Sequence, residues 1–176
     1  MDTQWVLENA KKVFFKAMLD GYFGECKNSV KSTSNDGNTK IITFTEGDFR
    51  VVDEYHTTPS SEKSAGTTTI FYRGAAVWWM AYGGEYPGRV IPFLKEVLRT
   101  TYENGIFNKG RGPESYSGGK RDDTIWLTYR CIGQISGWHS FHKFEGLETI
   151  TEIKGVGPSQ VRNELGHHYC MGMSLI

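Results

Sequence analysis

Apolar residues recur with helical spacing in two stretches of the chain and alternate with polar residues in most of the others. Residues 4–20 and residues 89–103 each place their apolar side chains on one side of a helix. Pro92 is compatible with the second helix because it falls in the first turn, and Asn104-Gly105 is a stop signal. The pattern therefore predicts two amphipathic helices that pack on another layer.

β-Branched and aromatic residues predict strands on both sides of the second helix, with hairpin turns at Glu46-Gly47-Asp48 and Arg73-Gly74. Short hairpin links favour antiparallel pairing. We therefore expect an α+β fold in one domain, residues 1–176, with a single antiparallel sheet and two main helices packed on one face. The predicted strands are residues 41–56, 67–72, 75–83, 124–133, 137–154 and 167–176, and the predicted loops are residues 31–40, 57–66 and 108–123.

The strand at residues 75–83 is apolar on both faces. Alternate side chains of a strand point to opposite sides, so one side is covered by the core and the other either is covered too or lines a cleft. The first side carries Trp78, Met80 and Tyr82, and the second carries Val77, Trp79 and Ala81. This strand is the main clue to function.

Composition narrows the classes of partner. The 176 residues carry 20 basic and 20 acidic side chains, so no global charge favours a nucleic acid polymer or a membrane surface. The N-terminus is too polar for a secretory signal, and no window approaches the ~18 apolar residues of a spanning helix. Cys26, Cys131 and Cys170 form no paired motif, and we expect reduced thiols in a cytoplasmic protein.

Several motifs together carry a resemblance: "VWWMAYGG", "FLKEVLR", "GRGPESY", "TYRC" and "FEGLETI". The chain resembles a bacterial domain-of-unknown-function family, whose members occur alone or behind an N-terminal helix-turn-helix. The resemblance implies a single α+β domain and a bacterial or phage origin, and it implies no reaction. The matched positions are Gly47, Asp48, Asp53, Tyr55, Gly66, Trp78, Met80, Tyr82, Gly83, Arg111, Gly112, Pro113, Tyr116, Tyr129, Phe144, Gly146, Glu148 and Tyr169.

Arg111 lies in a segment rich in glycine and in basic residues. Glycines allow backbone N–H groups to turn toward an anion, and a guanidinium binds carboxylate or phosphate through two hydrogen bonds. The alternative is a solvated loop with ordinary surface charges. In the first case Arg111 holds an anionic ligand, and its replacement is expected to leave the fold intact.

Other polar residues give weaker signals. His139 and His142 are three positions apart in a predicted strand and point to opposite faces, so no metal site is expected. Asp53 and Glu148 are candidates for an acid and a base, although such carboxylates are more often salt-bridge or turn residues. Glu148 is the stronger candidate because it lies in a matched motif beside Phe144.

The aromatic strand leaves two interpretations open. Trp78 and Met80 either fill the core, or the strand borders a cleft in which a planar ligand stacks and Arg111 holds its acidic end. We expect a non-enzymatic module that senses or sequesters a planar, anionic small molecule such as a nucleotide, without cofactor or metal. One alternative is a protein-interaction or self-associating regulatory domain, whose partner would be another protein or, in a homo-oligomer, a second copy of the chain. The other alternative is an enzyme that uses Glu148 or Asp53 as acid or base. The predicted ligand-binding residues are Trp78, Tyr82, Arg111, Tyr116, Tyr129 and Glu148.

Overall fold

The computed structural model describes residues 2–24, 27–122, 125–136, 141–155 and 157–176. The helices are α1 (Thr3–Met18) and α2 (Ile91–Asn104), with a π-helical turn, η1 (Leu19–Phe23), and the 3-10 turns η2 (Gly88–Val90) and η3 (Gly157–Ser159). The strands are β1 (Ser29–Thr33), β2 (Thr39–Glu46), β3 (Phe49–Thr57), β4 (Lys63–Tyr72), β5 (Ala75–Glu85), β6 (Ser115–Asp122), β7 (Ile125–Ile135), β8 (Lys143–Lys154) and β9 (Val161–Ser174).

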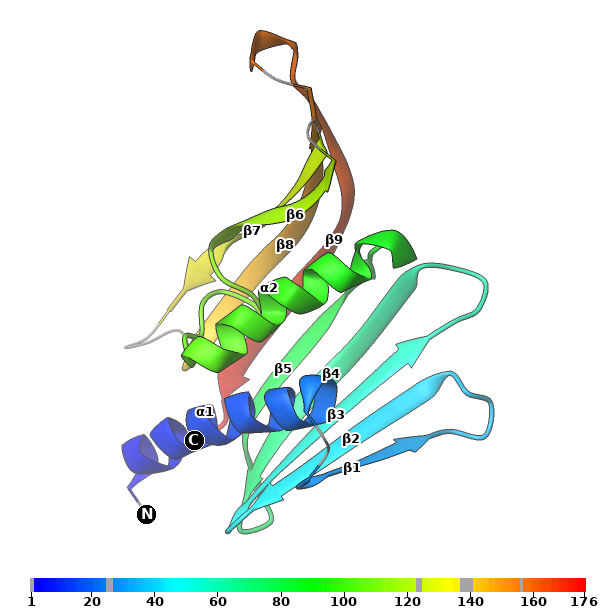
Figure 1. Ribbon diagram of the computed structural model, residues 1–176. Coiled ribbons are helices and arrows are strands. Elements are labelled where there is room, and N and C mark those ends of the chain that lie inside the picture. The colour runs from blue at the N-terminus through cyan, green and yellow to red at the C-terminus, as the bar shows by residue number, and fades with distance from the viewer. Residues whose placement is uncertain (1, 25–26, 123–124, 137–140, 156) are drawn as a thin grey trace.

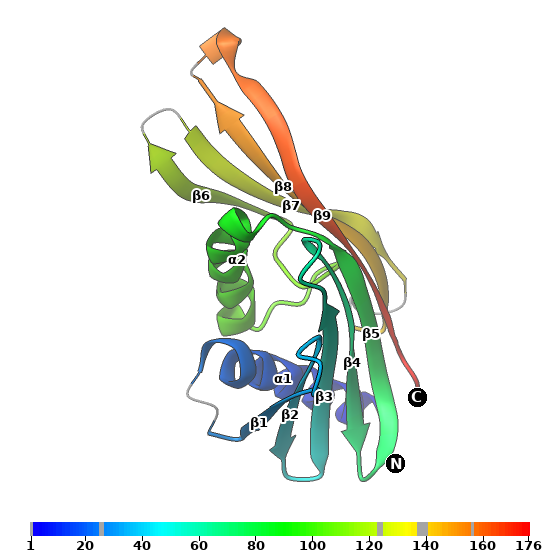
Figure 2. The ribbon, with the colours of Figure 1, turned by 90° about the vertical axis from the view of Figure 1, so that its right-hand side faces the viewer.

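The described strands form one antiparallel sheet with the order β1-β2-β3-β4-β5-β9-β8-β7-β6. Two meanders, β1 to β5 and β6 to β9, therefore meet where β5 pairs with β9 (Figure 1). Both helices lie on the same side of the curved sheet, and the opposite face carries none of the described helices (Figure 2). The predicted fold class, an α+β fold with one antiparallel sheet and two main helices on one face, is confirmed.

Both predicted helices are present, with the expected signals at their ends. The carboxylate of Asp2 accepts a hydrogen bond from the Trp5 N–H and caps the start of α1. Pro92 lies in the first turn of α2, and Gly105 ends that helix in the left-handed conformation at φ 63°. Among the described residues, no helix is long and apolar enough to cross a membrane.

The predicted loops are wrong in part, because each contains strand residues. Residues 31–33 belong to β1, β4 begins at Lys63, and β6 occupies the second half of the glycine-rich segment. Pairing with a neighbouring strand satisfies the backbone hydrogen-bonding groups of these polar stretches. The amino-acid composition of a stretch does not predict such pairing. The last strand, β9, likewise begins before the predicted position 167.

Trp78 fills the centre of the core beneath α1. The side chain is fully buried, and its ring stacks on Phe141 with centroids 4.3 Å apart and an interplanar angle of 4°. Its indole Nε1–H donates to the carbonyl of Phe141, and Phe14 of α1 approaches the ring edge-on at 5.3 Å. The core interpretation of Trp78 is the one that the structure bears out.

A β-bulge interrupts the alternation predicted for β5. Ile70 pairs with Trp78 while Phe71 pairs with Ala76, so Val77 is an extra residue. Val77 and Trp78 are consequently both buried, whereas Trp79 is half-buried. The expectation that Val77 shares the environment of Trp79 is wrong for this reason.

Candidate functional site

A cavity of about 390 Å³ lies between the helical layer and the sheet. Tyrosines from several elements dominate its wall: Tyr22 of η1, Tyr55 of β3, Tyr82 of β5, Tyr102 of α2, and Tyr86 beyond β5. The size lies within the range of about 300–1,000 Å³ typical of small-molecule sites. The other lining residues are Met18, Phe23, Lys40, Asp53, Thr57, Glu62, Ser64, Thr68, Met80, Ile91, Leu94, Lys95, Leu98, Arg111 and His168.

Asp53 is the buried carboxylate of this cavity, with 1% of its surface exposed. It accepts hydrogen bonds from the hydroxyls of Thr68 at 2.5 Å, Tyr22 at 2.5 Å and Tyr82 at 3.2 Å. Burial raises the pKa of Asp53, and these hydroxyl bonds offset that effect only in part. The sheet register creates the cluster, since Asp53 on β3 lies opposite Thr68 on β4.

Gly66 makes room for the tyrosine contact with Asp53. In the sheet it lies between Tyr55 on β3 and Tyr82 on β5. A Cβ at Gly66 would lie 2.7 Å from the Tyr82 hydroxyl oxygen and 2.6 Å from the carbonyl oxygen of Glu54. The missing side chain therefore allows Tyr82 to lean across β4 toward Asp53.

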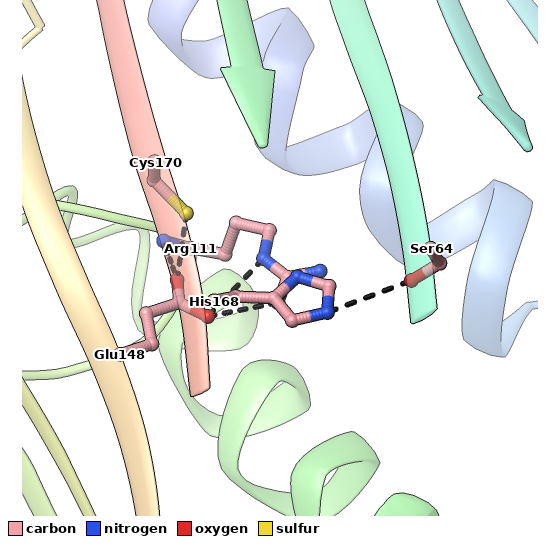
Figure 3. A network of polar contacts seen from close by, with 5 residues as sticks. All are labelled: Ser64, Arg111, Glu148, His168 and Cys170. Carbon is pink, nitrogen blue, oxygen red and sulfur yellow. Dashed lines mark hydrogen bonds and ion pairs between the residues drawn. The ribbon is translucent and has the colours of Figure 1, made fainter. Parts of the chain in front are cut away.

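Arg111 and Glu148 form the second polar cluster (Figure 3). The Glu148 side chain, fully buried on β8, accepts from the Arg111 backbone N–H at 2.6 Å and from Nη2 and Nε at 2.8 and 3.2 Å. Burial alone would raise the pKa of Glu148, but the charge and hydrogen bonds of Arg111 outweigh it and lower that pKa. The opposite charges of Arg111 and Glu148 therefore compensate each other within the protein.

His168 connects this ion pair to the cavity. Its Nδ1 lies 3.0 Å from Nη2 of Arg111, which donates, so the imidazole proton is assigned to Nε2. The ring stacks on Tyr86 at 4.8 Å, and its Nε2 faces the Ser64 hydroxyl at 3.5 Å (Figure 3). Burial and the neighbouring Arg111 charge lower the pKa of His168 to about 3, so the ring is neutral at physiological pH.

The glycines around Arg111 allow the loop to approach the sheet. A Cβ at Gly110 would lie 2.9 Å from a Glu148 carboxylate oxygen, and one at Gly112 would lie 2.4 Å from the Tyr129 hydroxyl. The carboxylate that receives the Arg111 N–H and guanidinium belongs to the protein itself. The predicted anion-binding geometry is therefore present, but Glu148 occupies it.

The predicted site residues separate into two groups. Tyr82 and Arg111 line the cavity, and Glu148 lies directly behind Arg111. Trp78, Tyr116 and Tyr129 do not line it. Trp78 and Tyr129 are fully buried core residues, and the Tyr116 hydroxyl donates to Glu96 on the outer side of α2.

Sequence reasoning missed the residues that complete the cavity, above all Tyr22, Tyr86 and His168. Their positions offered no local signal, because each comes from a different segment that only the fold brings together. Tyr86 has the most informative environment. Its side chain lines the cavity, and its hydroxyl is buried within the protein with no hydrogen-bond partner among the described residues.

Of the remaining sequence-based candidates that the structure describes, Cys131, Cys170 and His142 do not line the cavity. Cys131 and Cys170 are buried, free thiols, and the Cys170 thiol donates to Glu148 at 3.3 Å. Cys26 and His139 lie outside the described residues. Within the described part of the chain, no group of His, Cys, Asp and Glu side chains is arranged to hold a metal ion.

Comparisons with protein-family models, with curated proteins and with solved structures found no match to this chain. The resemblance to a bacterial domain-of-unknown-function family accordingly stays a prediction.

Proposed function

We propose that this protein binds a small, planar ligand in the tyrosine-lined cavity, as a module that senses or sequesters it. The observation that carries the proposal is the cavity itself, about 390 Å³ in size, which brings tyrosine rings from several elements together with the imidazole of His168. Flat aromatic walls favour a planar ring system.

The charges of the cavity suggest how such a ligand lies. Arg111 is already neutralised by Glu148, so the inner end offers hydrogen-bond donors but no free positive charge. The positive groups are Lys40 and Lys95, which line the cavity and are exposed to solvent. Lys40 also lies over the Tyr55 ring at 5.6 Å. We therefore place the acidic group of the ligand at these lysines, instead of at Arg111.

A nucleotide satisfies both requirements. Its base is planar, which suits the tyrosine walls, and carries ring nitrogen or carbonyl acceptors that suit the His168 Nε2–H. Its phosphate suits the two exposed lysines, which bind phosphate as point charges. The acidic side chain of Glu62 also lines the cavity, and its carboxylate accepts a hydrogen bond from the backbone N–H of Gly88.

An enzyme that uses Asp53 is the second candidate. Asp53 lines the cavity, and its raised pKa is the direction expected of a general acid or base. Glu148 is a poorer candidate because its side chain is fully buried behind Arg111 and does not line the cavity. Turnover of a bound ligand that stops in Asp53→Asn would favour this candidate over simple binding.

The test combines native mass spectrometry of the purified protein with calorimetric titration of AMP and GMP. We expect a retained small molecule or saturable nucleotide binding. Tyr55→Ala should weaken binding about threefold to tenfold, which corresponds to the loss of one aromatic contact from the cavity wall. Lys40→Ala combined with Lys95→Ala should weaken a nucleoside monophosphate and leave the nucleoside itself unchanged.

Lys31→Ala on β1 is the matched control, since Lys31 is exposed and lies outside the cavity. A parent protein that retains no small molecule and binds neither nucleotide would count against the proposed function. Binding that is insensitive to both the Tyr55 and the lysine variants would show that the ligand occupies another site.

A further inference from the structure

The centre of the helix-free sheet face carries three parallel rows of outward side chains. Cross-strand pairing defines each row across β7, β8, β9 and β5. The middle row is Ile132, Leu147, Tyr169 and Gly83. The row on one side is Gln134, Glu145, Met171 and Ala81, and the row on the other side is Arg130, Thr149, His167 and Glu85.

The middle row is the centre of an exposed apolar surface. Ile132 is 52% exposed, Tyr169 62% and the neighbouring Met171 52%, all unusually high for such side chains. They border a shallow hollow on this face, together with Ala81, Gly83 and Leu147. A contiguous apolar surface at the middle of a sheet is typical of a protein interface.

Each flanking row carries one exposed charged side chain on β7 or β8, and the two charges are of opposite sign. Glu145 lies in the row on one side of the apolar centre, and Arg130 lies in the row on the other side. Both are exposed to solvent. Glu85 stands at the far end of the Arg130 row, on β5 and outside the hollow. Along the direction of β7 and β8, the acidic side chain of Glu145 is therefore followed by the apolar middle row and then by the basic side chain of Arg130.

We propose that this face binds a second copy of this chain across a two-fold axis that runs along the middle row. In that arrangement the apolar row packs on its own copy, and the row with Glu145 faces the row with Arg130 of the other molecule. Face-to-face sheets lie about 10 Å apart. Glu145 and Arg130 stand on adjacent strands, so a long arginine side chain spans the remaining offset.

The order of the three rows favours a second copy over a different partner. A two-fold rotation about the middle row exchanges the row of Glu145 with the row of Arg130, so these two charges are complementary between the copies. An axis parallel to the strands would instead place each row against the same row of its copy, so Glu145 would face no basic side chain. The chain has no net charge, so no long-range repulsion opposes the association.

Sedimentation velocity over a range of protein concentrations tests this arrangement with two charge reversals. We expect the parent protein to dimerise reversibly, and Glu145→Arg and Arg130→Glu each to weaken the dimer at least tenfold. The decisive sample is an equimolar mixture of the two variants. In the heterodimer each reversed residue meets an opposite charge, so mixing should restore dimers that neither variant forms alone.

Glu54→Arg supplies the matched control, because Glu54 lies on the outward side of β3 and outside the three rows. It should dimerise like the parent, and thermal unfolding should show that all variants are folded. A parent protein that stays monomeric overturns the proposal. Variants that still dimerise, or a mixture that stays monomeric, overturn the two-fold arrangement.

Discussion

Asp53 and Glu148 are both buried carboxylates on the helix-covered face of the sheet, yet the protein satisfies them in different ways. Glu148 faces a cation, Arg111, which binds it through backbone and guanidinium N–H groups. Asp53 is bonded by hydroxyls, including those of Tyr22 and Tyr82. The pKa of Glu148 is accordingly held below its ordinary value, whereas burial raises that of Asp53.

The difference separates a structural half of the site from an adaptable one. A carboxylate locked to a buried arginine cannot release its partner without leaving a charge uncompensated in the core. A carboxylate held by neutral hydroxyls can gain or lose a proton at much smaller cost. The Asp53 side borders the cavity, and the Glu148 side supports its wall from behind. Variants that separate these roles follow, from the largest effect to the smallest.

The largest effect is expected for Arg111→Met. It leaves the Glu148 carboxylate buried without a cation and should lower the free energy of unfolding by about 3–5 kcal/mol. This prediction replaces the sequence-based expectation that loss of Arg111 leaves the fold intact. Urea unfolding followed by tryptophan fluorescence measures it.

Two further variants make this test specific. Arg111→Met combined with Glu148→Gln should recover much of the loss, because the uncompensated charge is gone. Arg99→Met on α2 removes an exposed arginine paired with Glu103 and should change stability by about 0.5 kcal/mol or less. If Arg111→Met costs no more than Arg99→Met, the ion pair is not structural.

Gly66→Ala should disturb only the Asp53 side. The new methyl group would displace the Tyr82 hydroxyl from Asp53 and crowd the Glu54 carbonyl, at a cost of about 1–3 kcal/mol. Gly88→Ala is the control, since no heavy atom lies within 4 Å of its Cβ position. Equal thermal unfolding of the two variants would argue against close packing at Gly66.

The pH dependence of stability should have opposite signs for the two carboxylates. Glu148 has a lowered pKa in the folded state, so its contribution is present above the unfolded value of about 4.5 and is lost as the pH falls through the folded value. Asp53 has a raised pKa, so its contribution is complete below the unfolded value of 3.8 and declines as the pH rises through the folded value.

Urea unfolding between about pH 3 and pH 7 tests these signs with Glu148→Gln and Asp53→Asn. The advantage of the parent over Glu148→Gln should grow as the pH rises, and its advantage over Asp53→Asn should shrink. A pKa difference of one between the folded and unfolded states corresponds to about 1.4 kcal/mol. Parallel pH profiles for the two variants would remove the distinction between the carboxylates.

Local sequence patterns predicted the helices and most strands because helical and strand periodicity are properties of neighbouring residues. Gly105 and Pro92 marked the ends of α2 correctly for the same reason. β1 and β6 escaped prediction because their polar residues form strands only through pairing with β2 and β7. The bulge at Val77 also depends on register, which alternation alone does not encode.

The candidate site was less predictable because its residues meet only across the sheet. Tyr82 and Arg111 stood out through unusual local surroundings, and both line the cavity. Tyr22 and His168 lie far apart in the sequence, and the register that brings them to one cavity is set by the whole strand order. Glycines near Arg111 suggested a loop that binds an external anion, whereas a neighbouring strand supplies the carboxylate.

The smallest change in stability is expected for Tyr86→Phe. Comparison with Tyr22→Phe separates a hydroxyl without a partner from one that donates to Asp53. The hydroxyl of Tyr86 is buried with no partner among the described residues, so its removal should leave stability unchanged or raise it by up to about 1 kcal/mol. Tyr22→Phe, which removes a hydroxyl donated to Asp53, should instead cost about 0.5–2 kcal/mol. Thermal unfolding of both variants measures the difference. A loss in Tyr86→Phe as large as that in Tyr22→Phe would mean that the Tyr86 hydroxyl is satisfied within the fold.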